Sequence, residues 1–178
     1  MYPIHFSRAR SSGSEKCWQE TCQHCCLDQQ MLWKRLVTDR VGAVIVLRRD
    51  GAALLQHRDN KPGLRYAGMW VPPGGHADAE EAMLDCARRE LREETGYAVK
   101  DLQFLLAFND KVEGWPEYQL TIFWSWYDEV QPVACYEGQA LAFVPRSAAD
   151  TYPIPPHLLD AWDTALAVAG LTPITSET

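Results

Sequence analysis

The order of apolar and polar positions predicts a sheet with several short strands. Residues 40–49 are rich in β-branched side chains, and residues 52–58 follow after Asp50-Gly51, which predicts a hairpin closed by a two-residue turn. Further strands are expected at residues 69–71, 102–108, 118–127 and 140–144. In residues 118–127, one face collects Leu120, Ile122, Trp124 and Trp126. The polar segments 59–68 and 110–118 contain glycine or proline and are predicted to be loops.

Two segments have the apolar spacing of amphipathic helices. In the first, Asp78 is a suitable N-cap, Glu81 follows three residues later as in a capping box, and Gly96 ends the pattern. The second covers residues 156–170 and is expected to bury Leu159, Trp162 and Leu166. Strands that alternate with helices favour an α/β fold in which two helical layers cover a sheet.

Composition and charge narrow the class of protein. A chain of 178 residues is most simply one domain, and its formal net charge of −7 argues against a nucleic acid polymer as partner. A small phosphorylated substrate can still bind if metal ions lie between the two negative parties. No apolar run reaches membrane-spanning length, and the N-terminus has no signal-peptide core, so we expect no membrane partner and a cytoplasmic location.

Residues 1–30 differ from the rest. They lack hydrophobic periodicity and are predicted to be a disordered extension, with the domain covering residues 31–178 from Met31 onward. The segment contains four cysteines with partial zinc-knuckle spacing: Cys17, Cys22, Cys25 and Cys26. A zinc ribbon needs two well-separated cysteine pairs, so structural zinc is the less favoured interpretation. Disulfides are likewise the weaker interpretation for a cytoplasmic protein.

Three carboxylates share one face of the first helix. With Glu90 at zero on a helical wheel, Glu93 and Glu94 fall at about −60° and +40°. Leu84, Ala87 and Leu91 form a separate apolar stripe. The repulsion among the carboxylates could be offset by water, salt and Arg89, or by a hard divalent cation such as Mg²⁺ or Mn²⁺. From the carboxylates alone, a solvated acidic face is the favoured interpretation.

The spacing of all the motif positions in residues 75–97 reverses the preference for a solvated acidic face. Starting at Gly75, the chain reads G-x5-E-x7-R-E-U-x-E-E-x-G-U and ends at Tyr97, where U denotes an apolar residue. This resembles the Nudix box of the MutT/Nudix hydrolase superfamily, with Tyr97 in place of the usual aliphatic residue. The resemblance is tight over the box and extends only by pattern over residues 32–170. It implies the Nudix α/β/α sandwich, a mixed β-sheet with a catalytic helix and a C-terminal helix.

The resemblance also implies roles for the residues of the box. Nudix enzymes hydrolyse a nucleoside diphosphate linked to another group. The implied metal ligands are the carboxylates of Glu90, Glu93 and Glu94 and the carbonyl of Gly74, with Mg²⁺ or Mn²⁺ as the cofactor. Glu81 and Arg89 are expected to hold the loop and the catalytic helix in register, while Gly75 and Gly96 are structural positions in the box.

Residues outside the box are assigned with alternatives. Glu137 is the favoured general base because relatives place a carboxylate at a similar distance after the box; Glu113 and Glu117 are its rivals. Arg58 and Arg65 are candidates for phosphate binding. Trp115, beside Pro116, is the better exposed candidate for stacking on a nucleobase, whereas Trp70 is expected to belong to the core.

The substrate is the least determined property. The absence of a clear substrate marker favours a MutT-like nucleoside triphosphate pyrophosphohydrolase, with an ADP-ribose or NDP-sugar pyrophosphatase as the alternative. A Nudix-fold module that binds a nucleotide without cleaving it is a further hypothesis, although such modules usually lose box carboxylates and this chain keeps them all. The expected partner is a small nucleotide, and the protein is expected to be a monomer or homodimer.

Overall fold

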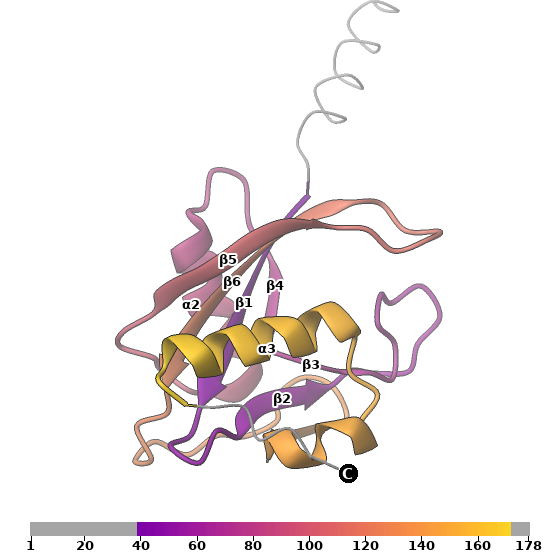
Figure 1. Ribbon diagram of the computed structural model, residues 1–178. Helices are drawn as coiled ribbons and strands as arrows, with labels where there is room; N and C mark the ends of the chain where they lie inside the picture. Colours follow the sequence, from indigo (N-terminus) through magenta and orange to yellow (C-terminus); the bar gives the residue numbers. More distant parts are fainter. Residues whose placement is uncertain (1–38, 172–178) are drawn as a thin grey trace, which may run out of the picture. The chain divides into compact units, whose positions relative to one another are not determined.

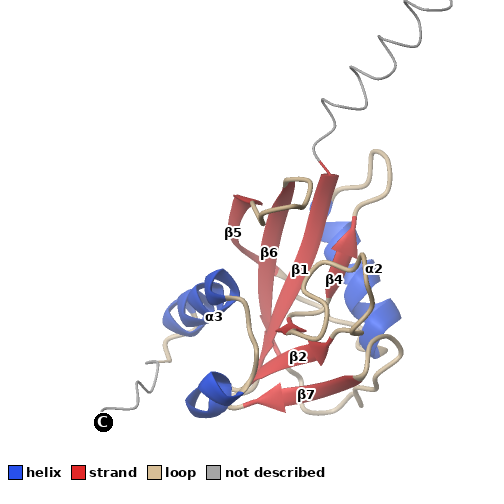
Figure 2. Ribbon diagram, turned by 90° about the vertical axis from the view of Figure 1, so that its right-hand side faces the viewer, coloured by secondary structure: helices blue, strands red, loops and turns tan. Residues whose placement is uncertain are grey.

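The computed structural model describes residues 39–171, which form a mixed sheet with a helix on each face (Figures 1 and 2). The elements in chain order are β1 (Asp39–Leu47), β2 (Ala53–His57), β3 (Trp70–Val71), β4 (Gly74–His76), α2 (Met83–Thr95), β5 (Gln103–Asp110), β6 (Tyr118–Trp126), β7 (Ala140–Val144), the 3₁₀ helix η1 (Arg146–Thr151) and α3 (Pro156–Val168).

Strand β1 is the centre of the sheet. It pairs in parallel with β6 along its whole length, from Asp39 opposite Tyr118 to Leu47 opposite Trp126. Because a strand has only two edges, β4 and β2 share the other edge of β1, β4 near its beginning and β2 at its end. Strand β5 lies antiparallel outside β6, while β3 and β7 pair with β2.

Alternate residues of β1 supply two separate cores. Ala43 and Ile45 are buried in the cluster that includes Trp162 of α3, whereas Val44 and Val46 are buried with Leu91 of α2. Figure 2 shows α2 and α3 on opposite sides of the sheet. The predicted α/β/α sandwich is therefore confirmed, and with it the inward face of β6 formed by Leu120, Ile122 and Trp124.

The first hairpin is present, but its turn is longer than predicted. The Gly51 N–H donates to the Arg48 carbonyl, and the Arg48 N–H donates to the Ala52 carbonyl, both at 2.9 Å. The connection therefore covers residues 49–51. Gly51 has a φ of 84°, in the left-handed region that the last position of such a turn requires.

Helix α2 begins later than the sequence pattern predicts. Its N-cap is Ala82, so the predicted cap at Asp78 is wrong. Asp78 and Glu81 instead form a turn, in which the Asp78 N–H donates to the Glu81 carboxylate at 2.9 Å and Glu80 has a φ of 63°. A left-handed residue cannot continue a helix, so this segment stays a loop. Gly96, with a φ of 72°, ends the helix as predicted.

Three smaller differences concern element bounds and packing. Strand β4 was not predicted, because a short segment with two glycines carries little strand propensity. Strand β5 continues to Asp110, into the segment predicted to be a loop. In the first turn of α3, Leu158 is buried and the predicted Leu159 is only half-buried, so the buried position there differs by one residue from the prediction. Trp162 and Leu166 are buried as predicted.

Some predictions fall outside residues 39–171. The extension at residues 1–30, the domain start at Met31 and the cysteines that could bind zinc all lie outside the described residues. Those statements remain predictions. Within the described part of the chain, no helix is both long enough and apolar enough to cross a membrane.

Candidate active site

Glu94 is a buried carboxylate at the centre of the site. It lies near the C-terminal end of α2, only 3% exposed, and its Oε2 accepts a hydrogen bond of 2.8 Å from the Gly74 N–H. Burial raises its pKa to about 8; the negative charges of Glu137 and Glu90 add to this rise, while the Gly74 hydrogen bond and the positive charge of Arg58 oppose it. Glu94 takes part in no ion pair with the described residues. Its charge is therefore poorly compensated by the protein.

The other two carboxylates of the face have different surroundings. Glu90 is half-buried against Gly75, where an added Cβ would lie 2.4 Å from the Glu90 Oε2, so the close approach requires glycine. Burial raises the pKa of Glu90, although a hydrogen bond from Arg89 opposes this. The side chain of Glu93 is 60% exposed and accepts a hydrogen bond from Arg89 at 3.2 Å. The predicted acidic face thus runs from a buried end at Glu94 to a solvated end at Glu93.

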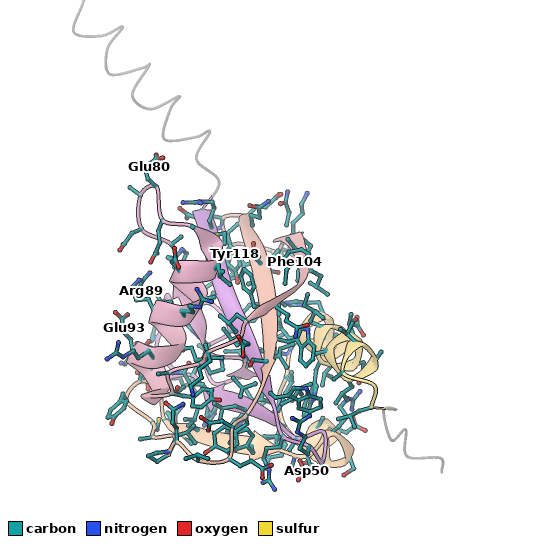
Figure 3. The ribbon with its side chains drawn as sticks, turned by 90° about the vertical axis from the view of Figure 1, so that its left-hand side faces the viewer. Asp50, Glu80, Arg89, Glu93, Phe104 and Tyr118 are labelled. Carbon is teal, nitrogen blue, oxygen red and sulfur yellow. The ribbon has the colours of Figure 1, made fainter. Side chains whose placement is uncertain are left out.

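Arg89 joins α2 to the segment that precedes it. Its Nε and Nη2 donate to the two carboxylate oxygens of Glu81 at 2.9 and 2.8 Å, a bidentate geometry. Nη2 also donates to the His76 carbonyl at the end of β4 at 3.0 Å. The hydrogen bonds from Arg89 are the main cause that lowers the pKa of Glu81 to about 2. In Figure 3, Arg89 and Glu93 project from α2, and Glu80 lies on the loop that precedes the helix.

The donor chemistry suits a hard divalent cation, although the carboxylates are not gathered into a closed cage. Among residues 39–171, no three His, Cys, Asp or Glu side chains converge on one point as metal ligands would. Arg89 holds Glu90 and Glu93, while Glu94 is turned towards Gly74. The poorly compensated charge of Glu94, next to further carboxylates, is nevertheless one that a bound divalent cation would stabilise.

Glu137 is held near this face by the backbone on either side of it. The Tyr136 N–H donates to the Glu94 carbonyl at 2.9 Å, and the buried Gln56 side chain donates to the Glu137 carbonyl at 2.9 Å. Gly138 has a φ of 79° and approaches the His57 carbonyl so closely that an added Cβ would lie 2.6 Å from it. The loop therefore connects the end of α2 to the end of β2. The Glu137 side chain itself is exposed.

The rival carboxylates lie in another loop. Glu113 and Glu117 belong to the connection between β5 and β6, and Glu117 pairs with Lys111 at 3.2 Å. After burial, the charge of Glu137 is among the causes that raise the pKa of Glu94 and of Glu90. This places Glu137 within electrostatic reach of the buried end of the acidic face.

A cavity of about 320 Å³ borders β4, the strand that meets the carboxylate face at Gly74 and Gly75. Its lining includes Gly74 and Gly75 of β4, Tyr118 of β6, and Trp115 in the loop before it. Gly74 thus lines the cavity while its N–H is bound to Glu94. None of the three α2 carboxylates lines the cavity, so Gly74 and Gly75 are the link between the two. An aromatic-lined cavity can hold a planar base.

The three predicted substrate-binding residues all line this cavity but differ in their environments. Trp115 is 38% exposed. Arg58 is half-buried, forms no side-chain hydrogen bond or ion pair with the described residues, and also lines a small second cavity that Glu137 borders. Its Nε is buried without a hydrogen-bond partner, as is that of Arg65. Arg65 is 9% exposed and its Nη atoms are bound to protein groups, Nη2 to Asp110 and Nη1 to Pro116. Arg58 is therefore the more available of the two cations.

Sequence reasoning missed two contributors to the site. Asp110 lies in the segment that the sequence predicts to be a polar loop, but it is 3% exposed and forms an ion pair with Arg65 at 3.1 Å. Gln56 is 2% exposed and holds the Glu137 backbone. Gln56 could have been found from the sequence, because it is a polar residue at an inward-facing position of a predicted strand. No local signal marked Asp110, because its partner lies 45 residues away in the sequence.

With this geometry established, the class of protein is clear. The family described as the NUDIX domain matches residues 37–161, so the chain belongs to the Nudix hydrolase family, as its sequence resemblance indicated. Nudix hydrolases act on nucleoside diphosphate derivatives and generally use divalent metal ions.

The chain is also similar to individual proteins and to solved structures. The m7GpppN-mRNA hydrolase NUDT17 of Danio rerio is 41% identical over 56 residues, which is 32% of this chain and 19% of that protein. The CTP pyrophosphohydrolase of Escherichia coli is 25% identical over 130 residues, 72% of this chain and 92% of that protein. The crystal structure of a MutT protein from Methanosarcina mazei has a TM-score of 0.61 at 20% identity, covering 70% of this chain and 90% of that one.

The matches cover very different shares of the relatives' own lengths. The matched segment spans only about a fifth of the length of each NUDT17 protein. The match to the CTP pyrophosphohydrolase extends over nearly all of that protein. The likeness to the MutT structure shows the fold.

Proposed function

We propose that this protein is a metal-dependent pyrophosphohydrolase that acts on nucleoside triphosphates in the manner of MutT. The observation that carries the proposal is the shared position of Gly74, which lines the aromatic cavity and whose N–H is bound to the buried Glu94. A nucleoside in the cavity would place its phosphates beside the carboxylate face. The match to a CTP pyrophosphohydrolase along nearly all of that protein's length supports a nucleoside triphosphate as substrate.

The residues of the carboxylate face would hold the metal. Glu90, Glu93 and Glu94, with the Gly74 carbonyl, are the proposed ligands for Mg²⁺ or Mn²⁺. A bound divalent cation would shield the phosphate oxygens and make water more acidic. Arg89 binds Glu81 and the His76 carbonyl, and in this way keeps the helix aligned with β4.

The remaining proposed roles concern the proton and the substrate. Glu137 would accept the proton of the attacking water, because it lies near the buried carboxylates and is exposed to solvent. Hydrolysis then consumes one water, breaks one phosphoanhydride bond and yields a nucleoside monophosphate and pyrophosphate. Arg58 would contact a phosphate, since it lines both cavities and its guanidinium forms no hydrogen bond or ion pair with the described residues. Trp115 would stack on the base.

The test is turnover across a nucleotide panel with Mg²⁺, with Mn²⁺ and with excess EDTA. The panel contains the nucleoside triphosphates, ADP-ribose, NDP-sugars and a capped dinucleotide, with products identified by chromatography. We expect a nucleoside triphosphate to give monophosphate and pyrophosphate, and EDTA to abolish the reaction. Preferred cleavage of ADP-ribose or an NDP-sugar would replace the proposed substrate, and turnover unaffected by EDTA would refute the metal assignment.

A matched pair of variants guards against a contaminating activity. Glu94→Gln should lose nearly all turnover, whereas Asp85→Asn removes an exposed charge from the same helix and should retain it. Tight nucleotide binding without turnover of any member of the panel would identify the protein as a non-catalytic nucleotide-binding module.

A further inference from the structure

One wall of the cavity is built on a buried ion pair that the proposed hydrolysis does not use. Arg65 and Asp110 meet at 3.1 Å, and their side chains are 10% and 4% exposed. Arg65 belongs to the loop between β2 and β3, and Asp110 ends β5. Two loops that are distant in sequence are therefore joined beside the cavity.

Arg65 holds both ends of the loop between β5 and β6. Its Nη2 donates to the Asp110 carbonyl at 3.0 Å, and its Nη1 donates to the Pro116 carbonyl at 2.8 Å. The guanidinium also lies over the Tyr118 ring, 4.2 Å from its centroid. The planar fork of one arginine thus fixes the base of residues 111–117, which carry Trp115.

The opposite end of the ion pair holds a strained residue. Tyr66 has a φ of 57°, which a residue with an aromatic side chain rarely adopts. Its hydroxyl donates to the Asp110 Oδ2 at 2.7 Å and lies 3.3 Å from the His157 Nε2 of α3. Strained backbone persists where its surroundings hold it. Tyr66 is held at its hydroxyl by the Asp110 carboxylate and at its carbonyl by the Met69 N–H, which donates at 3.0 Å.

Both loops face the cavity. Residues 63–66 and Trp115 are part of its lining, so the positions of these two segments set its width. Because each is bound to the same ion pair, loosening the pair would move both segments. Among the described residues, no hydrogen bond or ion pair joins Arg65, Asp110 or Tyr66 to Glu137 or to the carboxylates of α2.

We propose that Arg65 and Asp110 are positioning residues that fix the two loops around the nucleoside and determine how tightly it binds. This inference rests on the proposed function, because it takes the cavity as the nucleoside site. Arg65 then acts through Trp115 and the loop, and makes no phosphate contact of its own. The ion pair affects binding of the base-carrying part of the substrate and leaves the chemical step unchanged.

The first test is the kinetics of Arg65→Lys and Asp110→Asn. Lysine keeps the charge but cannot bridge both ends of the loop, and asparagine keeps the shape but not the charge. We expect KM to rise by about tenfold or more with kcat within about twofold, since binding common to ground and transition states is lost. Inhibition by the product nucleoside monophosphate should weaken in parallel, while inhibition by pyrophosphate should not change.

The second test does not depend on turnover. Lys111 is an exposed trypsin site at the start of the loop, and Lys100 is an exposed site in a different loop. In both variants cleavage after Lys111 should accelerate relative to cleavage after Lys100, as mass spectrometry can quantify. If the wild-type protein hydrolyses nothing in the panel, the proposed function fails, and this cleavage ratio still decides whether the ion pair fixes the loop.

The control is Arg146→Lys. Arg146 forms a fork with Asp163, at 2.6 and 2.8 Å, and this pair joins η1 to α3 away from the cavity lining. It should change neither KM nor the cleavage ratio. If the Arg65 and Asp110 variants do not fold, Tyr66→Phe removes only the hydroxyl and should raise both quantities by a smaller factor.

The proposal is overturned by any of three results in folded variants. The first is unchanged KM together with an unchanged cleavage ratio. The second is a fall in kcat at constant KM. The third is equal acceleration at Lys100 and Lys111, which would show general destabilisation.

Discussion

In the protein without bound metal, ionised Glu94 should oppose folding, and Glu94→Gln should therefore stabilise it. The carboxylate is 3% exposed and receives one hydrogen bond, from the Gly74 N–H. Burial is the main cause that raises its pKa from 4.5 to about 8. An acid that keeps its proton more tightly in the folded state than in the unfolded state destabilises the fold once the pH is high enough to remove it.

The sign and size follow from the two pKa values. Below about pH 4.5 the carboxyl is protonated in both states and costs nothing. Between that pH and about 8, unfolding releases a proton, so the free energy of unfolding falls by about 1.4 kcal/mol per pH unit. The accumulated cost is about 1 kcal/mol at pH 5 and about 3 kcal/mol at pH 7, and it is complete above pH 8.

The assay is urea unfolding of wild type and Glu94→Gln in EDTA at pH 5 and pH 8. Glutamine keeps an oxygen that can accept the Gly74 hydrogen bond, and any cost of its amide group is the same at both pH values. The stability advantage of the variant should therefore grow by about 3.5 kcal/mol from pH 5 to pH 8. Asp85→Asn, an exposed change on the same helix, should show no such growth.

Metal addition supplies the complementary measurement. Under the proposed assignment Mg²⁺ would bind the ionised carboxylate, so it should stabilise the wild type at pH 8 and have little effect on the variant. An advantage of Glu94→Gln that stays constant between pH 5 and pH 8 would refute the assignment of a poorly compensated charge to Glu94.

Three further predictions concern the proposed base, the glycine of the box and the chain before the domain. Glu137→Gln should lower kcat by about 10²–10⁴ with KM and metal dependence nearly unchanged, while Glu113→Gln should be milder. A milder effect of Glu137→Gln than of Glu113→Gln would move the base to the other loop. Gly75→Ala should displace the Glu90 carboxylate, which would lie 2.4 Å from the new Cβ, and so weaken metal affinity measured by titration of activity, with thermal stability changed much less. A chain that begins at Met31 should fold and match full-length turnover, and stoichiometric zinc in the full-length protein together with lower thermal stability of the shorter chain would contradict this.

The sequence determined most of the local structure and the chemistry of the helix. Alternation in β6 and the spacing in α2 follow from which side chains must be buried, and Gly96 ends α2 because a left-handed residue is needed there. The spacing of the box residues identified the family, and the family implied the sandwich. These properties depend on nearby residues or on a fixed motif, so they can be read along the chain.

The predictions that failed were those in which a distant residue decides the local conformation. The capping-box pattern at Asp78 has the correct local spacing, but Glu81 is bound by Arg89 from within the helix and the backbone turns at Glu80. Strand β4 exists because the edge of β1 next to Gly42 is open to it. Local propensity contains neither fact.

The site shows the same division. The sequence supplied the carboxylates of α2 and named Arg58, Arg65 and Trp115, but it could not say that Glu94 is buried while Glu93 is solvated. Only the tertiary structure brings Asp110 to Arg65 and so converts a candidate phosphate ligand into part of a buried ion pair. The physical reason is that the burial and the charge partners of a side chain depend on the packing of segments far apart in the chain, which no local pattern records.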